Sequence, residues 1–132
     1  MEFNMITAMR YEILSQNEIL DTQTNLIWQN EIVKNLSLTY DQALEYAKYI
    51  SNETGLTWRV PTIDELVDLI DRSQHFPASS FPNMLSNWFW SSTLYVGDVN
   101  HAWYVNFYDG TISNQTRLTD YYTVRLVRDK AA

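Results

Sequence analysis

The stretch Trp58-Arg59-Val60-Pro61-Thr62-Ile63-Asp64-Glu65-Leu66 carries the clearest structural signal in this sequence of 132 residues. Thr62 is a suitable helix N-cap, and Glu65 three residues later completes a capping box, in which each residue's side chain accepts from the other's backbone N–H. The apolar positions that follow at helical spacing are Ile63, Leu66, Leu69 and Ile70. The stretch therefore predicts a helix that starts at Thr62 and ends near Asp71.

A second helix is predicted just upstream, over residues 39–53. Thr39 and Gln42 have the capping-box spacing, and Gly55 is a natural C-terminal stop. The apolar stripe of this helix consists of Ala43, Leu44, Ala47 and Ile50.

Strand-forming residues surround the two helices. Segment 10–28 predicts two short strands joined by a turn at residues 21–25, and residues 72–87 read as an irregular loop. The further strands are expected at 89–94, 102–108, 111–116 and 122–128, with a hairpin turn at Asp109-Gly110. Strands, two helices and then a run of strands indicate a single α+β domain over residues 1–132 with a mainly antiparallel sheet and two flanking helices.

Charge and composition exclude several classes of partner. The formal net charge is −7 and the pI is about 4.6. Phosphate backbones are bound by clustered Lys and Arg, and nine cations in the whole chain make nucleic acid an unsuitable partner. No segment approaches the roughly 20 apolar residues of a membrane helix. The N-terminal stretch does not read as a signal peptide, so we expect a cytoplasmic protein or one exported by a non-Sec route.

The residue types needed for catalysis or metal binding are scarce. The chain has no cysteine and only two histidines, His75 and His101. This excludes disulfides, thiolate metal sites and cysteine nucleophiles, and leaves no set of three zinc ligands. Asp98 and Asn100 offer hard oxygens in one loop, which is too few for calcium. We therefore expect no enzyme, no catalytic residue, no cofactor and no metal.

Aromatic residues make up 14% of the chain, which is unusual for a small domain. Trp28, Trp58, Trp90 and Trp103 are assigned to the core. Trp88, just before the strand at 89–94, is the best candidate for an exposed ring. The expected ligand-binding residues are Trp88, Tyr95, Asn100, His101, Tyr108, Asn114, Arg117, Tyr121 and Tyr122. Flat rings beside amide and guanidinium donors suit sugar faces or protein surfaces.

Six segments taken in order resemble one bacterial family, the Legionella collagen-like protein C-terminal domain family, long described as a domain of unknown function. The similarity covers residues 10–128, and its pieces are 21–28, 39–46, 58–66, 89–93, 102–107 and 124–128. This resemblance implies a C-type-lectin-like or formylglycine-generating-enzyme-like fold with a mixed sheet. The formylglycine-generating activity depends on cysteine and does not carry over.

The resemblance also implies structural roles for particular residues. The residues expected to hold the fold together are Arg59, Thr62, Glu65, Trp90, Trp103 and Arg125. Arg59 and Glu65 are read as a polar network that joins the start of the helix to the sheet. Relatives often carry cysteines where this chain has Ala47 and Leu126, so we expect these two residues to touch in the core.

Two functions remain open from the sequence. The resemblance implies an adhesin-like, non-enzymatic recognition module that forms trimers in some relatives. The negative charge disfavours sulfated glycans and favours a protein or a neutral glycan as ligand. The alternative is an intracellular protein-interaction module, such as a phage-encoded or effector-type inhibitor of a protein partner.

Overall fold

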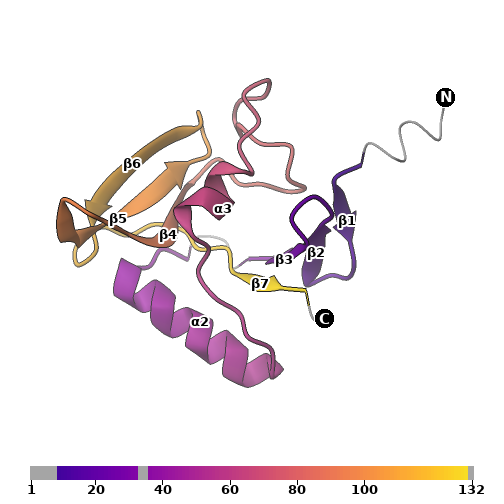
Figure 1. The fold of residues 1–132 in the computed structure, drawn as a ribbon, viewed down its shortest axis with the longest axis horizontal. Helices are drawn as coiled ribbons and strands as arrows, with labels where there is room; N and C mark the ends of the chain where they lie inside the picture. Colours follow the sequence, from indigo (N-terminus) through magenta and orange to yellow (C-terminus); the bar gives the residue numbers. More distant parts are fainter. Residues whose placement is uncertain (1–8, 33–35, 131–132) are drawn as a thin grey trace.

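The computed structural model describes residues 9–32 and 36–130, which form two antiparallel sheets and two helices (Figure 1). The elements in chain order are β1 (Tyr11–Ile13), β2 (Glu18–Asp21), β3 (Leu26–Gln29), α2 (Tyr40–Thr54), α3 (Ile63–Val67), β4 (Trp88–Tyr95), β5 (Asp98–Asn106), β6 (Thr111–Thr116) and β7 (Val127–Asp129). The α+β class is confirmed. Within the described part, neither helix is long and apolar enough to cross a membrane.

The first sheet has the order β1-β2-β3-β7. Segment 10–28 contains three strands, so the prediction of two strands was wrong in number, although the turn before Leu26 is confirmed. Asn25 adopts the left-handed conformation there, with φ of 63°. The last strand was predicted to span 122–128. It begins only at Val127, because Tyr122 and Thr123 bridge to Leu38 and Phe89 instead of β3.

The second sheet has the order β4-β5-β6 and is built from two hairpins. The bounds of β6 are as predicted. Strands β4 and β5 extend further toward the turn that joins them, and β5 ends at Asn106, two residues before the predicted end. Gly110 closes the second hairpin with φ of 84°, which explains the Asp109-Gly110 signal. Residues 72–87 form the expected irregular loop between α3 and β4.

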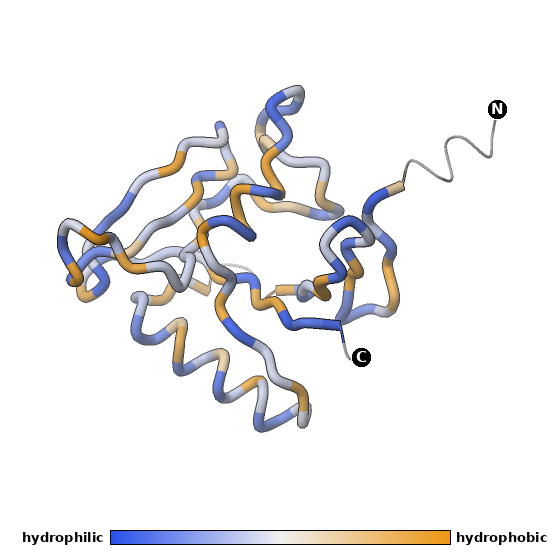
Figure 2. The backbone as a smooth tube through the Cα atoms, viewed as in Figure 1, coloured by the Kyte–Doolittle hydropathy of each residue, from blue (hydrophilic) through white to orange (hydrophobic). Residues whose placement is uncertain are grey.

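Both predicted helix starts are confirmed, with complete capping boxes at Thr39 and Thr62. Helix α2 ends at Gly55, which is left-handed as expected, and polar and apolar residues alternate along it (Figure 2). Helix α3 is shorter than predicted and ends at Val67. After Val67 the hydrogen bonds span three residues and not four, because Ile70 N–H donates to Val67 C=O. Asp71 N–H then donates to Ala78 C=O of the following loop.

The core is divided by the sheets into two halves, because neighbouring strand residues point to opposite faces. Trp90 and Leu126 belong to the half that α2 covers, whereas Phe89 and Val127 belong to the half on the side of α3. Ala47 lies in the same buried half as Leu126, as expected for neighbours; direct contact between them stays a prediction. Pairing between the named strands is antiparallel, and the parallel pairing in the described residues is an isolated bridge between Phe89 and Thr123, so the mixed sheet implied by the resemblance is not confirmed.

Candidate functional site

Three aromatic side chains on one face of the second sheet form a cluster that we call the ring platform: Trp88, Tyr104 and Tyr122. The Trp88 and Tyr104 rings are parallel within 4°, with centroids 5.0 Å apart. The Tyr122 ring is tilted against both, at 5.2 Å from Trp88 and 5.1 Å from Tyr104. Trp88 is 39% exposed while Tyr104 is buried beneath it. The indole is therefore supported by Tyr104 while part of the residue remains open to solvent.

Strand register explains why these rings meet. Trp90 lies opposite Tyr104, and Trp88 lies opposite Asn106. Trp88 is two residues from Trp90, so its side chain is on the same face of the sheet as Tyr104 and is its diagonal neighbour. Tyr122 arrives from outside the sheet, because Thr123 exchanges backbone hydrogen bonds with Trp88 and Trp90 at 2.9 and 3.1 Å. Burial among the rings raises the pKa of the Tyr122 phenol well above its ordinary value of 10.0. The phenol therefore stays neutral at physiological pH.

The same face continues onto β6 with uncharged polar side chains. By register, Thr111, Ser113 and Gln115 lie opposite Asn106, Tyr104 and Ala102 of β5. A flat ring beside hydroxyl and amide groups provides both an apolar contact surface and hydrogen-bonding partners.

A second group of predicted residues lies on the opposite face, where the β4–β5 hairpin turns. This hairpin-end cluster consists of Tyr95, His101, Trp103 and Asn114. The Tyr95 ring meets the Trp103 ring edge to face at 5.5 Å, and His101 Nδ1 lies 2.9 Å from Asn114 Oδ1. Trp103 is only partly buried, so its assignment to the core was wrong. Tyr95 is its only aromatic neighbour among the described residues.

The remaining predicted ligand-binding residues are separate from both groups. Tyr108 lies at the other end of β5, where its ring stacks on Phe76 with centroids 4.3 Å apart. Arg117 forms an ion pair with Asp41 of α2 at 2.7 Å and lies over the Tyr40 ring. Asn100 and Tyr121 are exposed. The nine residues thus form several groups and not one site.

Arg59, Thr62 and Glu65 lie together at the start of α3. Arg59 donates twice to the Glu65 carboxylate, at 2.7 and 2.8 Å, and Glu65 Oε1 also accepts from the Thr62 N–H at 2.9 Å. The backbone of Arg59 exchanges two hydrogen bonds of 2.9 Å with Val127. Although burial opposes it, the Arg59 hydrogen bond helps to hold the pKa of Glu65 below its usual value. These contacts join the helix start to β7.

Arg125 is 1% exposed and meets backbone carbonyls in place of a carboxylate. Its guanidinium donates to Gln29 C=O and Asn30 C=O and lies over the Phe81 ring at 4.8 Å. Burial lowers the pKa of Arg125 to about 10. Trp90 is fully buried, and its indole N–H donates to Leu38 C=O at 2.8 Å. Both residues therefore tie distant backbone segments together.

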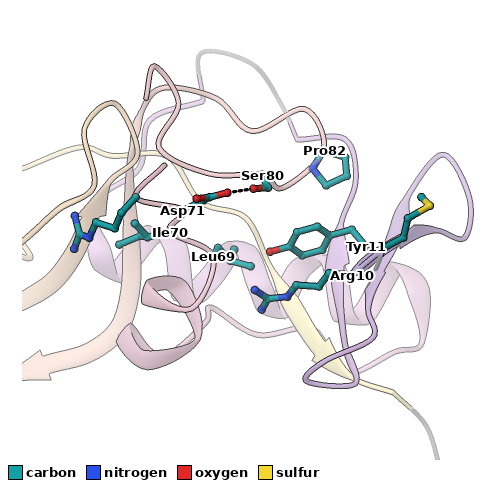
Figure 3. A pocket seen from close by; sticks show the side chains of 9 residues that line it. Arg10, Tyr11, Leu69, Ile70, Asp71, Ser80 and Pro82 are labelled. Atoms are coloured by element: carbon teal, nitrogen blue, oxygen red, sulfur yellow. Dashed lines mark hydrogen bonds between the residues drawn. The ribbon is translucent and has the colours of Figure 1, made fainter. Parts of the chain in front are cut away.

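Among the hollows of the described surface, one of about 550 Å³ lies between β1 and the loop after α3 (Figure 3). Tyr11 points into it, and burial raises the pKa of its phenol to about 12. Arg10 at its rim is held by Asp21 and Asp68, and Asp71 accepts from Ser80. The charged side chains that line this hollow are thus already engaged, since Arg72 also donates to Gly110 C=O at 3.1 Å.

No group of three His, Asp or Glu side chains in residues 9–32 and 36–130 is arranged to hold a metal ion. In the loop considered for calcium, Asp98 accepts from the Asn100 N–H at 2.9 Å and lies 3.7 Å from His101. These contacts explain the role of the Asp98 carboxylate as a side chain that stabilises the turn between β4 and β5.

Sequence reasoning did not single out Tyr104 or Phe76 as partners of candidate rings. Tyr104 could have been found from strand alternation, since it lies two residues from Ala102 in a strand that was predicted. The stacking of Phe76 on Tyr108 joins an irregular loop to a strand end, and no local pattern indicates such a pair.

Comparisons with known proteins place the chain in one family. The comparison with curated proteins gave no match, and neither did the comparison with solved structures. The model of one protein family, described as the Lcl C-terminal domain, matches residues 17–128. This match spans most of the 132 residues, from β2 to β7. The chain therefore belongs to the Lcl C-terminal domain family.

Proposed function

We propose that this domain is a non-enzymatic recognition module that binds a neutral glycan on the ring platform. The observation that carries the proposal is the indole of Trp88, which lies parallel to Tyr104 at 5.0 Å and is 39% exposed. The C–H face of a pyranose ring packs well on a flat aromatic ring, and hydroxyl groups at its rim need polar partners. Ser113 and Gln115 lie on the same face of the sheet to provide them.

Charge supports a neutral ligand over a sulfated one. The chain carries a net charge of −7, and Arg117 at the other end of β6 is already paired with Asp41. A polyanion would meet overall repulsion, whereas a neutral sugar would not.

The test compares ring variants on a glycan array and by calorimetry with a neutral glycan that the array identifies. Trp88→Ala is expected to weaken binding at least tenfold, or about 1.4 kcal/mol, because a central tryptophan often contributes that much. Trp88→Phe should retain most of the affinity. Tyr49→Ala removes an aromatic ring of α2 that is 60% exposed, more than Trp88, and is the control.

Salt dependence provides a second readout. Binding of a neutral glycan should change little between low and high ionic strength. Unchanged affinity in Trp88→Ala, or binding restricted to sulfated glycans at low salt, would contradict the proposal.

A second candidate function is docking to a protein partner, in line with an inhibitor or another intracellular interaction module. Val96 is 96% exposed and Val99 is 63% exposed, both at the tip of the β4–β5 hairpin. Exposed apolar side chains on a protruding tip favour a protein contact. A partner lost by Val96→Ser/Val99→Ser and retained by Trp88→Ala would support this function over glycan binding.

A further inference from the structure

Four strands form the edges of the two sheets, and three of these edges are short or occupied. The outer edge of β4 is covered, because Trp90 and Thr123 are hydrogen-bonded and Ser92 N–H donates to Pro61 C=O at 2.7 Å. Strand β7 is paired on its outer side with Arg59. Strand β1 has three residues and carries Glu12 at its centre. Short, charged or covered edges are how proteins avoid pairing with other chains.

Strand β6 differs from these three edges. It is six residues long, lies at the outside of its sheet (Figure 1), and contains no charged residue and no proline. Its pairing with β5 is continuous from Thr111 to Thr116, without the register shifts that interrupt β4. Within the described residues, it is therefore a regular strand edge that lacks the usual protection.

The outward-facing groups of β6 follow from its register. Arg117 N–H donates to Asn100 C=O at 2.8 Å, and hydrogen-bonded pairs alternate along an antiparallel ladder. Thr111, Ser113 and Gln115 therefore direct their backbone groups toward β5. The N–H and C=O groups of Ile112, Asn114 and Thr116 point outward, and in the described part of the chain no backbone partner meets them.

We propose that β6 pairs with β6 of a second copy of this chain, antiparallel and around a two-fold axis. Two copies that each carry a charge of −7 repel one another, and this uncharged strand is where their backbones can approach at least electrostatic cost. In this arrangement residues 111–116 of the two copies lie against one another, and no charged side chain belongs to the paired segment. A two-fold contact uses the edge once per copy and stops at a dimer.

The association should be weak, because a strand-to-strand contact buries less area than a standard interface. We expect a dissociation constant on the order of 0.1 mM, measured by sedimentation and light scattering over a concentration series. A monomer throughout that series, or a trimer, would overturn the proposal.

A pair of variants at Asn114 tests the edge. Asn114→Pro removes a backbone N–H that points outward, and it breaks no backbone hydrogen bond to β5. Edge strands tolerate proline at such positions. Asn114→Thr loses the same contact with His101 but keeps the N–H, and is the matched control. Proline should raise the dissociation constant at least about tenfold and threonine about twofold or less. Equal effects of the two variants would overturn the proposal.

Hydrogen exchange of the unaltered protein tests the edge without any substitution. Raising the concentration should slow exchange at the amides of Ile112, Asn114 and Thr116, while the inward amides of Ser113 and Gln115 are protected at every concentration. Uniform exchange at the outward amides in a sample shown to be dimeric would place the contact elsewhere. Because no glycan is present, these results do not depend on the proposed function.

Discussion

Two tryptophans, one from each sheet, have opposite environments. Trp28 of β3, in the first sheet, is 1% exposed and meets the Phe81 ring edge to face at 6.1 Å. Trp88 of β4, in the second sheet, is 39% exposed and rests on Tyr104. Leu66 of α3 and Phe81 of the following loop belong to the same buried cluster as the first ring, whereas the second ring remains partly exposed. The comparison shows that an aromatic composition alone does not separate core from binding surface.

The largest effect that separates the two sheets is expected at Trp28. Trp28→Ala should lower the free energy of unfolding by about 3–5 kcal/mol, because it leaves a large cavity in a packed core. Urea unfolding followed by far-UV circular dichroism measures this loss. A loss below about 1 kcal/mol would mean that the ring is not enclosed as the structure shows.

A smaller effect is expected at the junction between β7 and α3. Arg59→Ala should lower the free energy of unfolding by about 1–2 kcal/mol, because it removes a bidentate bond to Glu65 that is partly screened by solvent. The Arg59 side chain is 35% exposed, which keeps the loss moderate. Thermal melts measure the change, and Lys48→Ala, which breaks an exposed pair with Glu45, is the control. An unchanged melting curve for Arg59→Ala would remove the structural role.

Acid should weaken the same junction. Because the folded protein holds the pKa of Glu65 below the usual 4.5, the unfolded chain binds the proton more tightly. The stabilisation by Glu65 is therefore complete above the unfolded pKa and is lost as the pH falls through the lower folded pKa. Stability measured from pH 6 to about pH 3 should fall less steeply in Glu65→Gln than in the original chain. Identical slopes would show that other carboxylates cause the loss.

The smallest stability effect is expected on the exposed side of the comparison. Trp88→Ala should cost about 1 kcal/mol, because the residue is 39% exposed and its truncation opens a surface position that water can fill, and not an enclosed cavity. If its cost equals that of Trp28→Ala, the ring is part of the core and the platform is not a binding surface.

Local chemistry made the helix starts and the hairpin predictable. The capping boxes at Thr39 and Thr62, the left-handed Gly55 and the Asp109-Gly110 turn each depend on residues within a few positions of one another. The family resemblance was predictable for the same reason, since its pieces are short and lie in order along the chain.

Contacts between distant segments explain the errors. Helix α3 stops at Val67 because the following residues pair with the loop near Ala78, and β7 begins late because Tyr122 pairs with Leu38. The site was only partly predictable, for a similar reason. The exposed candidate Trp88 follows from sequence, but its support by Tyr104 depends on which strands pair.

The carbonyl of Leu38 has a consequence for any molecule that settles on Trp88. It accepts from the indole N–H of Trp90 at 2.8 Å and from the backbone N–H of Tyr122 at 2.9 Å, one residue before the cap of α2. The Trp90 ring, the backbone of Tyr122 and the start of α2 are thus fastened at a single atom. The Trp90 rotamer and the backbone that carries Tyr122 are settled when the chain folds, so association need not order them.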